Sequence, residues 1–262
     1  MGIKPRSSGA FTLIELLLVI TIIGILAALG LPHLKGWGEG NTMTSATRQL
    51  MDDLALARQR AISGRSTVYV VFISPQAVDQ KFYDNLSAAD KKQALNLFSG
   101  QYTTYALFTR KPVGEQPGRE NPRYLTAWKS LPEKTFIATN KFVELQENVR
   151  FNYAETDRPF ATNAFPFPMA GSSNQLHLPF VAFNSQGQLV SENKNLGKPV
   201  YQNAIIPITK GSVFYARDRD GNLVLGPADA VETPKGNSQT NFNNIRVDWL
   251  TGRAKLERRE FQ

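Results

Sequence analysis

The stretch that decides the fold is residues 11–31, FTLIELLLVITIIGILAALGL, an apolar run that contains only three polar side chains, Thr12, Glu15 and Thr21. As an α-helix, this run would extend about 31 Å at 1.5 Å per residue, which matches the roughly 30 Å hydrocarbon core of a bilayer. The run therefore predicts a helix that can span a membrane once.

The flanks of this run predict its orientation. Residues 1–10, MGIKPRSSGA, are polar and carry Lys4 and Arg6. Cytoplasmic flanks of membrane helices are enriched in Lys and Arg, so we expect the N-terminus in the cytoplasm and the chain after Pro32 outside it. A cleaved secretory signal peptide is the alternative, but the apolar run exceeds a usual h-region of about 7–15 residues and lacks an A-x-A site.

Glu15 is the unusual residue of the predicted span. A charge at membrane depth costs about 2.5–3.5 kcal/mol on insertion scales, so its carboxylate should have a partner. If the chain were cut before Phe11, the new α-amine would lie four residues before Glu15, one helical turn away on the same face. Amine and carboxylate could then neutralise each other within one chain or between neighbours. A plain membrane anchor, whose carboxyl group reaches the headgroups or stays protonated, is the alternative.

These residues resemble a known processing site. Residues 9–15, GAFTLIE, are similar to the cleavage and methylation site of type IV prepilins and type II secretion pseudopilins. The resemblance implies that prepilin peptidase cuts before Phe11, that the new N-terminus is methylated, and that Glu15 stands at the fifth mature position. Ala10 occupies the place where Gly is usual, and Gly9 precedes it, so cleavage after Gly9 and cleavage after Ala10 both remain open.

The same resemblance implies a structural role. The subunit would be stored in the inner membrane through residues 11–31, with its C-terminal domain in the periplasm or on the cell surface. It would then assemble, as a minor subunit, with other pilin-like subunits and the assembly machinery of a type IV pilus or type II secretion pseudopilus. In such a filament Glu15 would pair with the N-terminal amine of an adjacent subunit.

A second helix signal follows the apolar run. Within residues 42–63, five apolar positions recur at spacings of three and four and predict a face that packs on a core. Gly64 is a suitable C-terminal stop. Residues 46–72 resemble the helix and first strand of the GspH and FimT type of minor pseudopilin. The five apolar positions are Ala46, Leu50, Leu54, Ala57 and Ala61.

The remainder of the chain has the pattern of antiparallel sheet. Short apolar runs are separated by turn residues such as Ser185-Gln186-Gly187, Asp220-Gly221-Asn222 and Thr251-Gly252. We therefore predict an α+β fold, in which a long N-terminal transmembrane and amphipathic helix packs on an antiparallel β-sheet domain. The predicted organisation is a leader over residues 1–10, a helix over 11–64 and a β-rich domain over 65–262. The expected strands are 66–73, 101–110, 124–129, 134–138, 175–184, 188–191, 204–209, 213–217, 245–250 and 254–258.

Ser87, with Asp90 three residues on, has the capping-box spacing and predicts the start of a short helix. Prolines at 112, 117, 122, 159, 166 and 168 predict long loops in the middle of the chain.

Signatures of catalysis are absent from the sequence. There is no cysteine, and the two histidines, His33 and His177, lie far apart in the chain, so a two-His metal site is not expected. We predict no enzyme activity, no cofactor and no metal. Residues 218–222, DRDGN, offer oxygen ligands suited to Ca²⁺, but a hairpin turn explains them equally and is the interpretation that we favour.

The C-terminal run 251–259, TGRAKLERR, is basic, in a chain whose 30 Lys and Arg against 22 Asp and Glu give a net charge of +8. Four cations in a terminal strand could neutralise phosphates, which makes a membrane-tethered binding module for DNA or another polyanion the alternative function. The run resembles the Gly-Arg-x-Arg element of FimT-type competence pilins, and the C-terminus resembles Verru_Chthon cassette protein D. We favour the interpretation that this run is an exposed final strand whose charged edge prevents aggregation. The four cations are Arg253, Lys255, Arg258 and Arg259.

Overall fold

The computed structural model is α+β, with an N-terminal helix and two antiparallel sheets. The chain divides into two compact units, residues 1–41 and 42–262. The structure describes residues 12–111, 121–143, 158–190, 202–240 and 243–258. Within these ranges, only the backbone is described for residues 27–41, 240 and 258.

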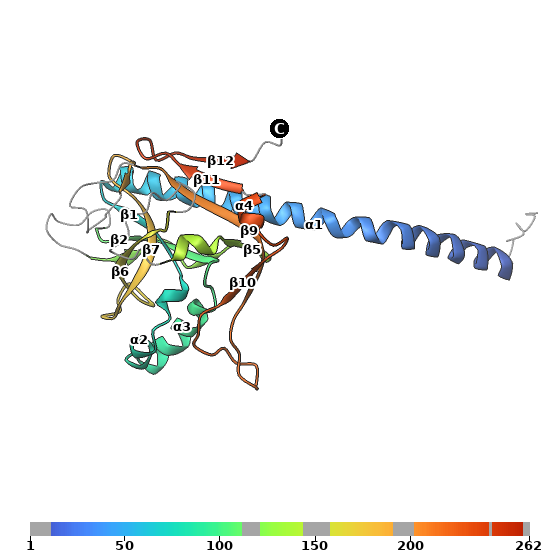
Figure 1. Cartoon of the computed structure of the whole chain (residues 1–262), viewed down its shortest axis with the longest axis horizontal. Coiled ribbons are helices and arrows are strands. Elements are labelled where there is room, and N and C mark those ends of the chain that lie inside the picture. The colour runs from blue at the N-terminus through green and yellow to red at the C-terminus, as the bar shows by residue number, and fades with distance from the viewer. Residues whose placement is uncertain (1–11, 112–120, 144–157, 191–201, 241–242, 259–262) are drawn as a thin grey trace, which may run out of the picture. The chain divides into compact units, whose positions relative to one another are not determined.

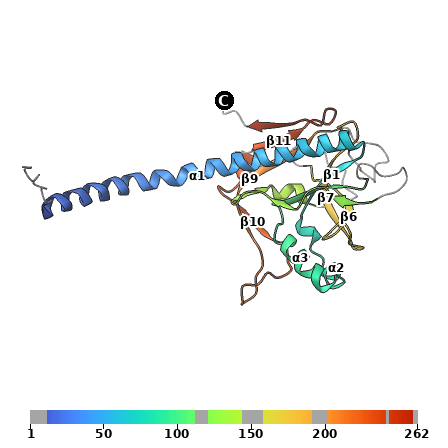
Figure 2. The ribbon, with the colours of Figure 1, turned by 180° about the vertical axis from the view of Figure 1, so that it is seen from behind.

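The long helix α1 runs from Leu13 to Gly64 and contributes to both units. In the second unit, the face predicted from the apolar spacing is buried: Ala46, Leu50 and Ala57 are fully inaccessible to solvent. Figures 1 and 2 show this C-terminal part of α1 beside β1 and β11 from opposite sides. The shorter helices are α2 (Gln80–Asp84), α3 (Ala88–Phe98) and α4 (Asn237–Thr240), with 3-10 turns at Pro75–Ala77 and Thr139–Phe142.

Two antiparallel sheets form the β-rich part of the described structure. The first has the order β3-β2-β1-β7-β6, with β4 on β2 and β8 on β7, and the second has the order β10-β9-β11-β12, with β5 on β9. The strands are β1 (Val68–Phe72), β2 (Thr104–Thr109), β3 (Arg123–Tyr124), β4 (Lys129–Ser130), β5 (Thr135–Ile137), β6 (Ala161–Pro166), β7 (Gln175–Phe183), β8 (Leu189–Val190), β9 (Ala204–Phe214), β10 (Asp229–Glu232), β11 (Asn243–Val247) and β12 (Ala254–Arg258).

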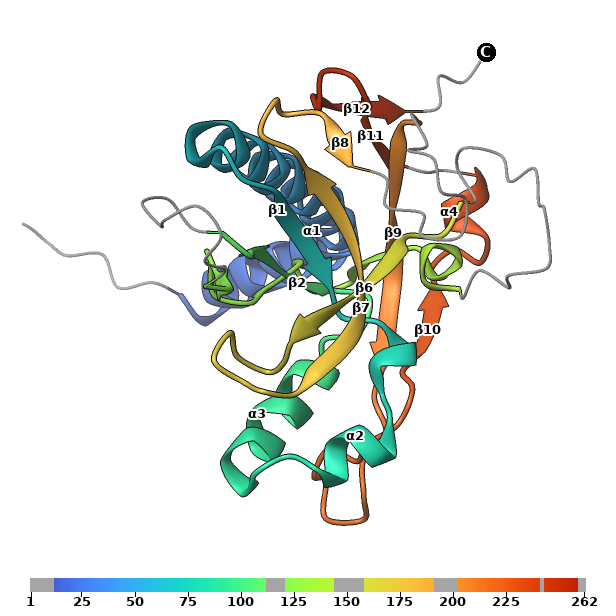
Figure 3. The same ribbon diagram turned by 90° about the vertical axis from the view of Figure 1, so that its left-hand side faces the viewer.

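Both faces of the first sheet are buried at its central strands β1 and β2, because alternate side chains of these strands enter different cores. On β1, Val70 and Phe72 face the core that α1 covers, whereas Tyr69 and Val71 face a second, aromatic core. This arrangement explains why the five residues of β1 form a continuous apolar run rather than an alternating one. In Figure 3, α2 and α3 lie at the end of this sheet, where Phe98 enters the aromatic core.

The first sheet curls so that its two edges are joined by side chains. The Arg110 guanidinium donates to the carbonyl of Ala164 at 3.0 Å, and the Tyr124 hydroxyl donates to the carbonyl of Pro166 at 2.8 Å. Both donors belong to the β2–β3 edge and both acceptors to β6. Burial raises the pKa of Tyr124, so its hydroxyl keeps its proton and this bond up to strongly alkaline pH.

The predicted antiparallel β pattern is confirmed, but several of the predicted strand boundaries differ from those in the structure. The strands of this pattern are divided between two antiparallel sheets. The run 204–209 and the first two residues of the run 213–217 belong to the single strand β9, and the run 124–129 is replaced by the short strands β3 and β4. The proline-rich middle, predicted as loops, contains β6, which ends at Pro166 and pairs only with β7 among the described residues. Proline is tolerated at such an edge because no ladder partner needs its missing N–H.

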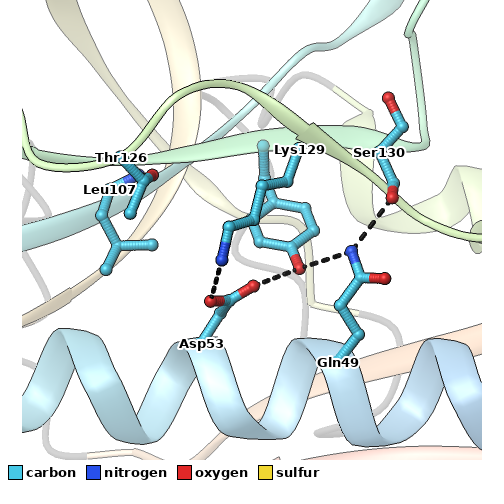
Figure 4. A network of polar contacts seen from close by, with 7 residues as sticks. Gln49, Asp53, Leu107, Thr126, Lys129 and Ser130 are labelled. Carbon is cyan, nitrogen blue, oxygen red and sulfur yellow. Dashed lines mark hydrogen bonds and ion pairs between the residues drawn. The ribbon is translucent and has the colours of Figure 1, made fainter.

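A polar network holds α1 against the β2–β4 edge (Figure 4). The Lys129 ammonium lies 2.6 Å from one carboxylate oxygen of Asp53, and the Tyr105 hydroxyl donates to the other at 2.7 Å. The Gln49 amide donates to the Tyr105 hydroxyl at 3.1 Å and to the carbonyl of Ser130 at 3.0 Å. Gln49 and Asp53 are one helical turn apart, so these contacts fix the position of α1 along the sheet.

We expect Asp53→Ala to lower the free energy of unfolding by about 2–3 kcal/mol, because it leaves a buried hydroxyl and an ammonium without their shared acceptor. Urea unfolding of the purified full-length chain in detergent measures the change. Asp52→Ala, at the exposed neighbouring position, is the control and should stay within about 0.5 kcal/mol of wild type. Equal effects of the two substitutions would contradict a role for the network in stability.

In the part of the chain that the structure describes, no helix is long and apolar enough to cross a membrane. The predicted span over residues 11–31 begins at a residue outside that part, and it stays a prediction.

Candidate functional site

The N-terminus of α1 is closed by a reciprocal pair of side chains. A carboxylate oxygen of Glu15 accepts from the backbone N–H of Thr12 at 3.0 Å and from its hydroxyl at 2.9 Å. The Thr12 hydroxyl oxygen in turn accepts from the backbone N–H of Glu15 at 3.3 Å. This is the capping-box arrangement, in which two otherwise unpaired N–H groups at a helix start are satisfied by each other's side chains.

The structure thus brings Glu15 together with Thr12, a partner that the sequence analysis did not assign. The signal was present, because Thr followed three residues later by Glu is the capping-box spacing. The predicted cleavage and methylation residues, Gly9, Ala10 and Phe11, lie outside the described residues. The carboxylate therefore has a neutral hydrogen-bonding partner on its own chain and can still accept a cationic one.

The apolar side chains that follow Glu15 are exposed. From Leu13 to Leu26 every large aliphatic side chain keeps between 45% and 82% of its surface accessible. They occupy all sides of the helix rather than one stripe, which is typical of a helix surrounded by lipid or by other helices. A large exposed apolar surface of this kind marks a membrane or protein interaction site.

A second candidate site is the C-terminal hairpin of β11 and β12. Arg253 and Lys255 are exposed, and Lys255 stands directly opposite Arg246 on β11. Arg246 also forms a half-exposed ion pair with Glu257 at 3.3 Å. The hairpin face therefore carries a third cation, Arg246, that the sequence analysis missed and that alternation along β11 could have indicated. Of the other predicted cations, Arg258 is described only in its backbone within β12, and Arg259 lies outside the described residues.

The turn of this hairpin is held by a carboxylate and a close glycine contact. Asp248 accepts from the backbone N–H of Thr251 at 2.7 Å and from its hydroxyl at 2.8 Å. These bonds hold the pKa of Asp248 below its ordinary value. Gly252 has a left-handed φ of +62° and is packed so closely on the β7–β8 turn that a side chain there would overlap the carbonyl oxygen of Gly187.

Helix α1 reaches the same turn. The Arg58 guanidinium donates to the carbonyl of Thr251 at 2.6 Å. The glycine of the predicted Gly-Arg-x-Arg element is therefore a packing residue, whereas Arg253 and Lys255 point to solvent. This separates the positions that stabilise the hairpin from those that could contact an anion.

The Asp218–Asn222 segment is a hairpin turn in the structure. One Asp218 carboxylate oxygen accepts from the backbone N–H groups of Asp220 and Asn222 at 2.9 and 2.8 Å. The backbone carbonyl of Asp218 accepts from Gly221, whose φ is +82°. These hydrogen bonds hold the pKa of Asp218 below its ordinary value. The carboxylate of Asp218 is thus engaged by the turn itself, which supports the hairpin-turn interpretation.

Of the two histidines, His177 is the one whose side chain the structure describes. His177 lies exposed on β7 opposite Ala164, and the side chain of His33 is not among those described. Among the described residues, no group of three or more His, Asp or Glu side chains is placed to hold a metal ion. The absence of enzyme activity nevertheless stays a prediction.

Comparison with known proteins found one family model, the prokaryotic N-terminal methylation motif, which matches residues 5–31. The match includes residues 5–10 of the leader, both predicted cleavage positions and the apolar run. No curated protein and no solved structure matched the chain. The motif indicates a type IV pilin-like protein that prepilin peptidase processes and that assembles with other pilin subunits.

Proposed function

We propose that this chain is a minor, structural pilin-like subunit of a type IV pilus or type II secretion pseudopilus. Prepilin peptidase removes the leader, the new N-terminus at Phe11 is methylated, and the apolar part of α1 packs among the helices of neighbouring subunits. The observation that carries this proposal is the methylation motif over residues 5–31. The exposure of all sides of the helix between Leu13 and Leu26 supports it further.

The proposal includes a single inner-membrane span over residues 11–31, with the leader in the cytoplasm and the β-rich domain in the periplasm or on the cell surface. Lys4 and Arg6 before the span support this orientation. Glu15 would make the transition from storage to assembly possible. While the subunit is in the membrane, Thr12 satisfies its carboxylate, and in the filament the amine of an adjacent subunit supplies a countercharge.

Intact-mass and N-terminal analysis of the protein from its native membrane, with and without prepilin peptidase, tests the proposal. We expect a peptidase-dependent, methylated N-terminus at Phe11 or, if the cut follows Gly9, at Ala10. A chain that still begins at Met1 in the presence of the peptidase would overturn the proposal and leave a static membrane anchor.

A second candidate function is a membrane-tethered module that binds DNA or another polyanion. It is favoured by one observation, the exposure of Arg253 and Lys255 beside Arg246 on the β11–β12 hairpin. Each phosphate that a cation neutralises releases condensed counterions, so such binding should weaken steeply with salt.

For this candidate, we expect the double substitution Arg253→Ala and Lys255→Ala to abolish salt-sensitive DNA binding or to reduce the slope of log K against log salt by about 2. Fluorescence anisotropy with a labelled duplex measures both quantities. The control is Lys81→Ala with Lys92→Ala, two exposed lysines on α2 and α3. Absence of binding by the wild-type chain would exclude this function.

A further inference from the structure

The ribbon of β9 and β10 carries apolar side chains on both of its faces. Val213, Tyr215 and Ala230 turn inward and pack against the core that α1 covers. The register pairs Phe214 with Asp229 and Ser212 with Val231, so these four residues share the opposite face. A ribbon at a domain surface normally alternates between apolar inside and polar outside. The outer face of this ribbon departs from that rule, because it carries exposed apolar side chains.

The outer ribbon face, which we define as Ser212, Phe214, Asp229 and Val231, is exposed. Phe214 keeps 59% of its surface accessible and Val231 keeps 47%, and they are diagonal neighbours on adjacent strands. Val224, farther along the same hairpin, adds a third exposed apolar side chain at 45%. Figure 1 shows this hairpin continuing past β10 to its turn in the lower part of the view.

The ribbon is held in place rather than loosely attached. The buried amide of Gln101 donates to the carbonyls of Phe98 and Gly226 at 3.0 and 2.9 Å and accepts from the backbone N–H of Ala228 at 2.8 Å. The Tyr215 hydroxyl donates to the carbonyl of Gln101 at 3.4 Å. The outer ribbon face is therefore presented in one conformation, so little entropy would be lost when a partner covers it.

The size of this face decides what kind of partner it fits. Its two exposed apolar side chains, Phe214 and Val231, offer on the order of 200 Å² of apolar surface, whereas a stable independent complex buries about 800 Å² on each partner. The face is thus too small to recruit a free partner alone. It suffices for a neighbour that another contact already holds nearby, at an effective concentration of roughly millimolar.

We infer that the outer ribbon face contacts the globular domain of an adjacent pilin-like subunit, one that carries its own N-terminal methylation motif and is held beside this chain by helix packing. The inference rests on the proposed function, because helix packing in a filament supplies the additional contact that this small face needs to hold a partner. Asp229, exposed beside the apolar pair, supplies the polar rim that such contacts usually have.

Site-specific photocrosslinking of the full-length chain in its native membrane tests the inference. With p-benzoylphenylalanine in place of Phe214, we expect a crosslinked product whose second component, identified by mass spectrometry, begins at a processed, methylated N-terminus. The same probe in place of Leu250, which is 51% exposed on the β11–β12 turn, is the control and should give no such product. Adding Val231→Asp should lower the yield of the Phe214 product about tenfold or more, since it places an unpaired charge in the contact.

The outcomes separate this inference from the proposed function. If the chain is processed and assembled but position 214 gives no product, or only products with proteins that lack the motif, the ribbon contact is overturned and the proposed function stands. If N-terminal analysis of the same preparation finds an unprocessed chain, the proposed function fails and the ribbon contact fails with it.

Discussion

Gly252→Ala is expected to lower the free energy of unfolding by roughly 4 kcal/mol, a large part of the roughly 5–15 kcal/mol that stabilises a typical domain. Two effects add. A left-handed φ of +62° costs an alanine about 1 kcal/mol, and the new methyl group would overlap the carbonyl oxygen of Gly187. Since that obstacle is backbone, the β7–β8 and β11–β12 turns would have to separate, and the Arg58 contact to Thr251 would be disturbed with them.

A matched control isolates the steric part of this effect. Gly221 also has a left-handed φ, +82°, but nothing lies within 4 Å of the position that its side chain would occupy. Gly221→Ala should therefore cost only about 1 kcal/mol. Urea unfolding of the full-length chains in detergent compares the two. Equal losses would show that backbone conformation alone sets the cost and that the turn–turn contact is unimportant.

Glu15→Gln is expected to leave peptidase processing intact and to reduce the fraction of subunits assembled into filaments by about 10- to 100-fold. Glutamine at this position preserves the capping box with Thr12 but removes the charge. The substitution removes the attraction between the carboxylate and an amine in an apolar environment. Each 1.4 kcal/mol of that attraction corresponds to a factor of ten in the equilibrium constant for assembly. Quantifying the chain in sheared-filament and membrane fractions measures the change.

The contrasting substitution is Thr21→Val, in the same part of α1. The Thr21 hydroxyl donates to the carbonyl of Leu17 within the helix at 2.7 Å and takes no part in the cap. We expect assembly of this variant to match wild type within about twofold, because an intrahelical bond of this kind contributes little. Wild-type assembly of Glu15→Gln would contradict a countercharge role for the carboxylate.

The local elements were predictable where one residue pattern dictates one structure. The spacing of Ala46, Leu50 and Leu54 set the buried face of α1 before any contact was known. Ser87 and Asp90 predicted the start of α3, and in the structure Ser87 accepts from the Asp90 backbone N–H. The turns at Gly187, Gly221 and Gly252 were also predictable, since each needs a left-handed residue between apolar runs.

The errors arose where local signals are ambiguous. β6 was assigned to a loop because its segment is rich in proline, and only its place at a sheet edge makes Pro166 acceptable there. β10 has four residues and no distinctive composition, so its pairing with the C-terminal half of β9 decides its conformation. The division of the strands between two sheets also depends on long-range pairing that short runs do not encode.

By itself, the sequence determined the apolar helix, the place of Glu15 within it, the capping spacing to Thr12 and the methylation motif, because each depends on neighbours within one or two helical turns. Only the tertiary structure decided that Asp53 meets Lys129 and Tyr105, that Gly252 packs on Gly187, and that Phe214 and Val231 share an exposed face. The physical reason is that these contacts join residues brought together by sheet register and turn geometry, whose energies arise from packing after the chain has folded.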